Sequence, residues 1–208
     1  MVKKNYIVEN TKIDPYGDTL WSSRDLTLVI LLAVASFAYT ALIGQLAWLF
    51  TGIPASNLVF TIGHAIIISL SLLIYQGKRW RFFLQHVLFA ILIIPTYLQG
   101  TPFELLPRLG IVMHGIQADI LFNTIYGFFK ERNKLVWLSI FIAVEFFLAA
   151  PFINILWFSL IYPPAFVTLL IDTILLLLPV VIVESLVGGL IGYKIYQRVK
   201  EVGLVKDK

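Results

Sequence analysis

Residues 26–50 read LTLVILLAVASFAYTALIGQLAWLF, a run of 25 residues without a charged side chain. A helix that crosses about 30 Å of hydrocarbon needs about 20 mainly apolar residues, because each residue adds about 1.5 Å. This run is therefore long enough to span a bilayer. The whole chain is 59% hydrophobic and 13% charged, far from the composition of ordinary soluble domains. The sequence predicts an all-α integral membrane protein.

Five more apolar stretches follow the first, so we predict six transmembrane helices. The third is short and the fourth is polar for a membrane helix. Together they form a membrane domain, 26–193, between a polar N-terminal tail, 1–25, and a C-terminal tail, 194–208. The predicted spans are Leu26–Phe50, Asn57–Gln76, Phe82–Leu98, Pro107–Phe129, Leu135–Trp157 and Pro164–Tyr193.

The basic residues predict the orientation of these spans. Of the 16 Lys and Arg residues, 15 fall in the two tails and in the second and fourth connections, which leaves only Arg108 on the other side. Because cytoplasmic loops are enriched in Lys and Arg, we expect both termini in the cytoplasm and a multi-pass protein of the plasma membrane. The net charge of +4 thus follows from topology and does not indicate a nucleic-acid partner. Residues 1–25 lack the apolar stretch of a signal peptide, so the first span is expected to be an uncleaved start-transfer sequence.

Several kinds of chemistry are excluded by the sequence. The chain has no cysteine, which rules out disulfides, thiolate metal sites and thiol nucleophiles. It has no phosphate-binding glycine motif, so we do not expect it to hydrolyse ATP, and it has no G-x-S-x-G or H-E-x-x-H motif. We therefore predict neither an enzyme nor a bound cofactor or metal. The alternative is a self-contained membrane protein that handles lipid or a haem bound by His64 and His114, or an intramembrane enzyme that uses Glu145 and Asp172.

Polar side chains at membrane depth mark the candidate ligand site. An ionisable group in the hydrocarbon costs about 2.5–3.5 kcal/mol on insertion scales, so each one needs a reason. Aromatic walls with a few polar groups suit a small-molecule pocket, and we predict such a cavity open to the outside between the fourth, fifth and sixth spans. The competing interpretation is that these side chains hydrogen-bond between helices and fix the bundle. The predicted lining is His114, Gln117, Glu145, Asn154, Trp157 and Asp172.

Two acidic residues are expected to have structural partners. Asp119 is eleven residues from Arg108, or about 16 Å along a helix, so the two cannot pair directly. We expect Asp119 to find its partner near the basic loop Lys130–Lys134. Glu184 is in register with the glycines of the sixth span and is interpreted as an interface or structural residue.

Small residues form a stripe on the first span and a second stripe on the sixth. Steps of three and four residues keep each stripe on one helical face, and small side chains let another helix approach closely in lipid. Two interpretations stay open: packing within this chain, or a docking surface for a separate membrane subunit. The residues are Ala33, Ser36, Thr40, Gly44, Ala47, Gly188 and Gly192.

Three motifs, together with the size and the six-span topology, carry a resemblance to a known family. The chain opens its first span with WSSRDL at 21–26 and leaves the membrane with GGLIGYKIY at 188–196. The stretch GIVMHGIQADILF at 110–122 has an acidic residue after a glycine- and glutamine-containing run. These features resemble the substrate-binding S component of energy-coupling factor (ECF) vitamin transporters, and the last one resembles the thiamine-precursor branch.

The resemblance implies a function and a set of partners. The protein would bind a scarce water-soluble vitamin or vitamin precursor from outside. It would then associate with a transmembrane coupling subunit and two cytoplasmic ATPases, and ATP hydrolysis there would topple it to release the ligand inside. The stripe on the first span and the end of the sixth span would supply the docking surface.

Overall fold

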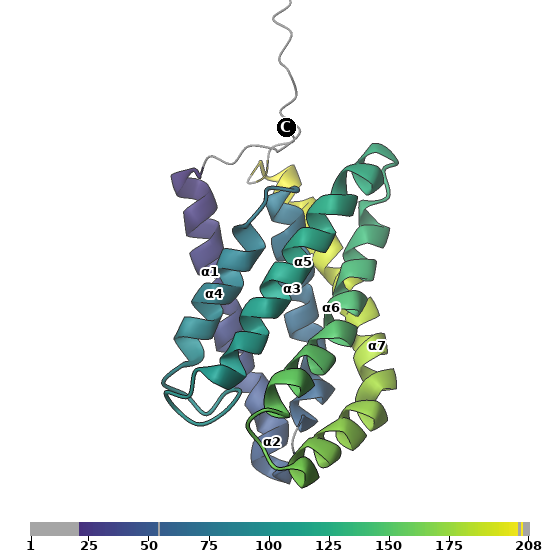
Figure 1. Ribbon diagram of the computed structural model, residues 1–208. Helices are drawn as coiled ribbons and strands as arrows, with labels where there is room; N and C mark the ends of the chain where they lie inside the picture. Colours follow the sequence, from purple (N-terminus) through teal and green to yellow (C-terminus); the bar gives the residue numbers. More distant parts are fainter. Residues whose placement is uncertain (1–20, 54, 204, 206–208) are drawn as a thin grey trace, which may run out of the picture.

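The computed structural model describes residues 21–53, 55–203 and 205, which form a bundle of helices (Figure 1). The prediction of an all-α fold is confirmed for these residues, since they contain helices, turns and loops but no strand. In chain order the elements are α1 (Ser23–Tyr39), the π-helix η1 (Thr40–Gly44), α2 (Gln45–Thr51), the 3-10 helix η2 (Ser56–Phe60), α3 (Thr61–Tyr75), α4 (Arg81–Ile93), α5 (Leu106–Glu131), α6 (Leu135–Phe158) and α7 (Pro164–Glu201).

Four helical stretches are long and apolar enough to cross a membrane, and they correspond to four of the predicted spans. They are Ser23–Thr51, Ser56–Tyr75, Leu135–Phe158 and Pro164–Glu201. The other two predicted spans match the short α4, with 13 residues, and α5, which has 26 residues but buries Arg108 and Asp119. The helices are therefore compatible with an all-α membrane protein.

The ends of the membrane domain differ from the predicted bounds. The first helix begins at Ser23, three residues before the predicted start, and the last helix continues to Glu201, beyond the predicted end at residue 193. Residues 1–20, 204 and 206–208 of the two predicted tails lie outside the described part of the chain.

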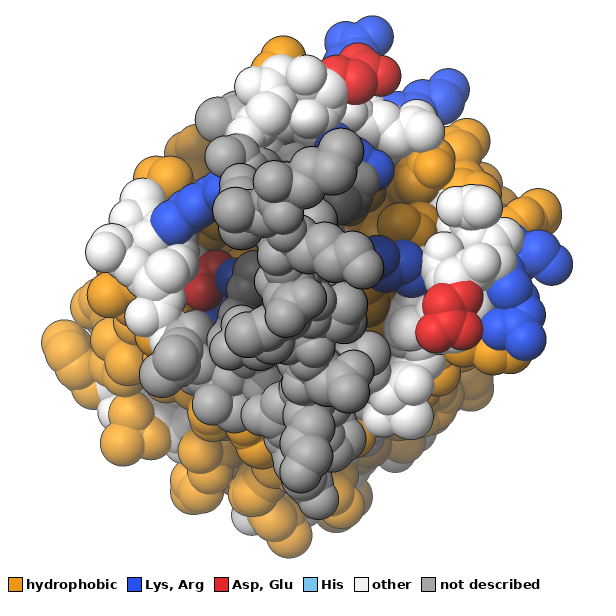
Figure 2. Space-filling model, turned by 90° about the horizontal axis from the view of Figure 1, so that it is seen from above, with side chains coloured by type: hydrophobic (Ala, Val, Ile, Leu, Met, Phe, Trp, Pro, Cys, Tyr) orange, Lys and Arg blue, Asp and Glu red, His pale blue; other side chains and the backbone are white. Residues whose placement is uncertain are grey.

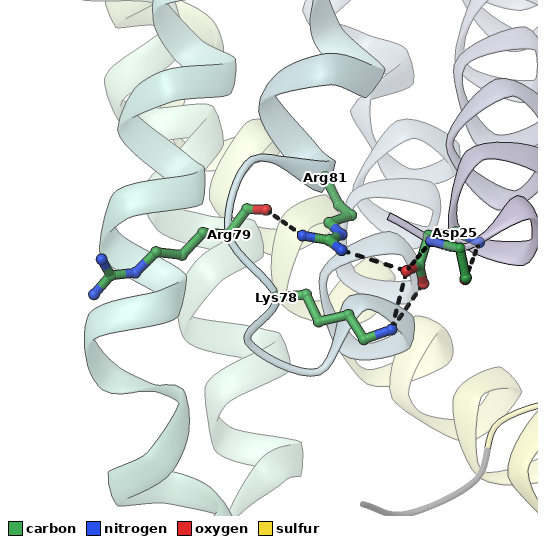
Figure 3. Close-up of polar contacts among 5 residues, drawn as sticks. Asp25, Lys78, Arg79 and Arg81 are labelled. Carbon is green, nitrogen blue, oxygen red and sulfur yellow. Dashed lines mark hydrogen bonds and ion pairs between the residues drawn. The ribbon is translucent and has the colours of Figure 1, made fainter. Parts of the chain in front are cut away.

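The start of α1 is fixed by a cap and by two ion pairs. The Ser22 hydroxyl accepts a hydrogen bond from the Asp25 amide at 3.1 Å, and the Asp25 carboxylate accepts one from the Ser22 amide at 3.3 Å. The same carboxylate pairs with Lys78 at 2.8 Å and with the buried Arg81 at 3.3 Å (Figure 3). A capping box thus places a carboxylate where it holds α1 to the connection between α3 and α4.

Basic side chains gather at this end of the bundle. The start of α1, the α3–α4 and α5–α6 connections and the end of α7 lie together here (Figure 1). Seen from this side, Lys and Arg side chains lie around the rim (Figure 2). Arg108 lies at the start of α5, at the opposite end. The described residues thus have the asymmetric charge distribution that the sequence predicts.

Both small-residue stripes pack inside the chain. A Cβ added at Gly188 would lie 2.6 Å from the Cβ of Ala65, and one added at Gly192 would lie 2.8 Å from the Cβ of Ser69, so α7 approaches α3 closely at these glycines. The stripe on the first span is also enclosed, with Thr40 half-buried and the others buried: Ala33, Ser36, Thr40, Gly44 and Ala47. These contacts agree with packing within the chain, and the docking role of the stripes stays a prediction.

Replacing Gly188 or Gly192 by alanine is expected to lower the free energy of unfolding by about 1–3 kcal/mol, because the methyl group overpacks the α3–α7 contact. Gly127→Ala is the matched control, since a Cβ there would meet nothing within 4 Å. Denaturant unfolding of the three variants in mild detergent measures the effect. Equal stability of all three would contradict the close α3–α7 packing.

Asp119 caps the start of α4. Its carboxylate accepts hydrogen bonds from the backbone amides of Trp80 at 2.8 Å, Phe82 at 3.1 Å and Phe83 at 3.4 Å. Asn123, one turn along α5, donates a further bond at 2.9 Å. The prediction that Asp119 has its partner near Lys130–Lys134 is wrong, because the free amides at a helix N-terminus satisfy the carboxylate instead.

Glu184, in the middle of α7, has a comparable role at the start of α3. Its carboxylate accepts hydrogen bonds from the backbone amides of Thr61 at 2.6 Å and Ile62 at 3.1 Å, in the first turn of α3. The carboxylate therefore ties α7 to α3, which agrees with the structural interpretation of this residue.

Candidate functional site

A cavity of about 410 Å³ lies in the half of the bundle away from the basic end. Its wall draws on η1, α2, η2, the helices α3 to α7 and the connections at that end, from Thr40 of η1 to Ile174 of α7. The residues 97–101 of the α4–α5 connection and Tyr162 of the α6–α7 connection also line it, and both connections lie at the lower end in Figure 1. The cavity therefore extends from these loops into the bundle.

The wall of the cavity is aromatic and formally uncharged. Among the described residues that line it there is no Asp, Glu, Lys or Arg. Phe89 of α4, Phe146 and Phe147 of α6 and Phe166 of α7 contribute rings, and Trp48 of α2 contributes an indole. Uncharged polar side chains lie between these rings, and they can select a ligand by hydrogen bonding.

Three histidines, the only three in the chain, meet at the inner part of this cavity. His64 comes from α3, His86 from α4 and His114 from α5. The ring of Phe146 lies among them, with its centroid 6.5 Å, 5.5 Å and 5.7 Å from their respective ring centroids. In all three the Nε2 atom is buried and has no hydrogen-bond partner. Four aromatic rings from four helices thus form one cluster with three unused ring nitrogens.

His86 is held by a hydrogen bond within α4 and by close packing against α5. Its Nδ1 lies 3.1 Å from the carbonyl oxygen of Phe82, which can only accept, so Nδ1 carries the hydrogen. In the neutral ring Nε2 is then an acceptor. On the α5 side, a Cβ at Gly115 would lie 2.5 Å from the Cβ of His86, so only glycine lets His86 pack this close to α5.

Two of the six side chains predicted to line the cavity do so. His114 is 4% exposed, and Asn154 lies two helical turns beyond Phe147 on α6; the Oδ1 atom of Asn154 is also buried without a partner. Gly110 makes room for Asn154 and for the neighbouring Trp157, because a side chain at position 110 would meet both.

The other four predicted residues lie elsewhere. Gln117 of α5 donates a hydrogen bond to Glu145 of α6. This pair therefore connects two helices, in agreement with the alternative that the polar side chains fix the bundle. Glu145 instead borders a shallow depression on the outer face of α6, beside Ala149. Trp157 packs at Gly110 outside the cavity lining, and Asp172 is exposed on α7. None of these four side chains therefore lines this cavity.

The α4–α5 connection closes the loop end of the site and is held by Arg108. This arginine is 2% exposed and donates hydrogen bonds to the carbonyl oxygens of Thr96 at 2.7 Å, Thr101 at 2.9 Å and Glu104. The Glu104 carboxylate in turn accepts bonds from the Thr101 amide and hydroxyl, and these bonds lower the pKa of Glu104. Gln99, whose Oε1 is buried without a partner, faces the cavity from this clamped connection.

His86 is the functional candidate that sequence reasoning missed at this site, and His64 was considered only as a haem ligand. His86 lies near the start of the predicted span Phe82–Leu98, beside the basic second connection, and this place alone puts it in the inner half of the membrane, away from the predicted outer cluster. The signal for its position is Gly115, next to His114, because a glycine beside a histidine on a polar helix permits close approach of a neighbour. Among the described residues, no three His, Asp or Glu side chains are arranged to hold a metal ion.

Comparisons with models of known protein families, with curated proteins and with solved structures found no significant match to this chain.

Proposed function

We propose that this chain is the substrate-binding subunit of an uptake transporter of the ECF type, with six spans and both termini in the cytoplasm. It would take a small water-soluble ligand, a vitamin or a precursor, from outside the plasma membrane. The observation that carries the proposal is the cavity of about 410 Å³ at the end away from the basic residues, with unpaired polar atoms in its wall.

The unpaired polar atoms are the strongest support for a ligand. Buried polar groups are almost always hydrogen-bonded, and each one left unpaired costs about 1–3 kcal/mol. The cavity wall holds five of them, on five side chains: His64, His86, Gln99, His114 and Asn154. A small molecule that pairs these atoms would recover that cost, and the cavity volume lies within the usual range of about 300–1,000 Å³ for ligand pockets.

In this proposal, the energy for transport comes from separate subunits. It carries no phosphate-binding glycine motif, so energy for uphill transport has to come from other subunits. The resemblance to S components supplies those partners: a transmembrane coupling subunit and two cytoplasmic ATPases. In this proposal the basic end of the bundle faces the cytoplasm, where those ATPases act.

Native mass spectrometry of protein purified in mild detergent, combined with an absorption spectrum, tests the proposal. We expect a co-purifying molecule that is lost from His114→Leu and Asn154→Leu and retained by Asp172→Asn, because the first two residues line the cavity and the third does not. Its uptake into cells should depend on separate ATPase subunits. Retention by the two cavity variants would contradict the proposal, and a Soret band would favour the haem-handling alternative.

A further inference from the structure

We infer that the histidine cluster at the inner end of the cavity binds the hydrogen-bond-donating end of an uncharged aromatic ligand, with His86 as the fixed acceptor. The inference rests on the proposed function only in taking the cavity as a ligand site. It adds the chemical class of the ligand, its charge and its direction in the cavity.

The charge of the ligand follows from the lining. A buried ion needs a counter-charge or a set of hydrogen bonds, and none of the described lining residues is Asp, Glu, Lys or Arg. An anion would also face the lone pair of His86 Nε2, which repels it. The described lining therefore supplies no counter-charge to an ion of either sign, whereas an uncharged ligand needs none.

The requirement for donors follows from His86. Its Nδ1 hydrogen is committed to the Phe82 carbonyl at 3.1 Å, so its Nε2 offers only a lone pair, and this lone pair has no partner in the protein. The residue is 2% exposed, so water does not compensate freely. His114, 4% exposed, and His64 present two more unpartnered Nε2 atoms around the same Phe146 ring. The ligand end that enters this cluster has to bring N–H or O–H groups.

The aromatic character of the ligand follows from the rings around the cluster. His64 lies edge-on to Phe89 and Phe147, with centroids 5.8 Å and 5.7 Å apart. Rings arranged edge to face around a cavity favour a flat partner that continues the same packing. A planar ring with donor groups at one edge satisfies both the stacking and the acceptors.

Four probes of nearly equal shape separate these requirements. Benzamide is uncharged and has N–H donors, benzoate is an anion, benzamidinium is a cation, and N,N-dimethylbenzamide is uncharged but has no N–H. We expect benzamide to bind the purified full-length protein in a titration calorimeter and to raise its melting temperature. The other three should bind about tenfold more weakly or less. Benzoate and N,N-dimethylbenzamide leave the Nε2 acceptor unpaired, and benzamidinium brings a charge to a wall with no Asp or Glu among its described residues.

Variants at position 86 test the acceptor itself. His86→Leu should weaken benzamide binding by about tenfold, while His86→Gln, whose amide oxygen reaches the region of Nε2, should recover part of the loss. Asp172→Asn changes an exposed side chain that does not line the cavity, so this variant should bind like the unchanged protein. A merely structural role of His86 would lower the melting temperature without changing the preference for benzamide over N,N-dimethylbenzamide.

Two results would overturn the inference without touching the proposed function. The first is benzoate, benzamidinium or N,N-dimethylbenzamide binding as well as benzamide. The second is absence of benzamide binding in a protein whose co-purified molecule is released by His114→Leu. If instead the cavity variants keep that molecule and the probes do not bind, the proposed function fails together with the inference.

Discussion

Replacing Asp119 by alanine is expected to lower the free energy of unfolding by about 3–5 kcal/mol. The change leaves the amides of Trp80, Phe82 and Phe83 without their acceptor at a site where Asp119 is 3% exposed. Each orphaned buried donor costs about 1–3 kcal/mol. The total stays below the sum of these costs because the variant no longer buries a carboxylate.

Chemical denaturation in mild detergent, followed by circular dichroism, measures this loss. Asp119→Asn is the informative control, because it keeps one oxygen that accepts from an α4 amide and places an NH₂ group against the others. Its stability should lie between that of the unchanged protein and that of Asp119→Ala. If Asp119→Ala unfolds at the same denaturant concentration as the unchanged protein, the carboxylate does not hold the start of α4.

Most of the helical architecture was predictable because it depends on local sequence alone. A long uncharged run has few alternatives to a membrane-spanning helix, and proline or glycine between runs marks the connections. The predicted Leu135–Trp157 differs by one residue from α6, and the predicted Asn57–Gln76 by one residue at each end from the stretch Ser56–Tyr75. The weakest prediction was the third span, since α4 ends at Ile93 and the chain then turns.

The face that each helix turns inward was not predictable to the same degree. Helix α6 is apolar almost throughout, so polarity does not single out its inner face. The polar residues Glu145 of α6 and Asp172 of α7 were assigned to the cavity by depth alone. Depth gives the height of a side chain in the bundle, but the helix rotation decides whether it points inward. In the structure Asp172 is exposed, whereas Asn154, predicted for the same cavity, lines it.

The histidine cluster depends on contacts that lie far apart in the sequence. His64, His86 and His114 come from three helices, and only the close α4–α5 approach at Gly115 brings His86 to the other two. Similarly, the sequence indicates that the small-residue stripes are packing surfaces, but it does not indicate which helix they contact. In the structure the glycines of α7 contact α3. Sequence patterns thus identify interacting faces, and the three-dimensional arrangement decides what they contact.

Filling the cavity is expected to have the largest effect on ligand binding. Ala150 of α6 lines the cavity, and phenylalanine at this position would occupy space that the ligand needs. Overpacking of about 1–3 kcal/mol against a bound ligand corresponds to about a tenfold to hundredfold loss of affinity. The empty volume of about 410 Å³ can take the ring, so the variant should fold and keep its melting temperature without ligand.

Ala149→Phe is the matched control, since it adds the same ring one residue earlier on the same helix. Ala149 borders the outer depression beside Glu145 and is absent from the cavity lining. Binding of the co-purified molecule, measured by native mass spectrometry, should therefore be lost in Ala150→Phe and kept in Ala149→Phe. The reverse result would move the ligand site to the outer face of α6, where Glu145 and Gln117 would then be its polar groups. Equal loss of binding in both variants would instead indicate that an added ring destabilises α6 at either position. In that case the melting temperatures of both ligand-free variants would be lower than that of the unchanged protein.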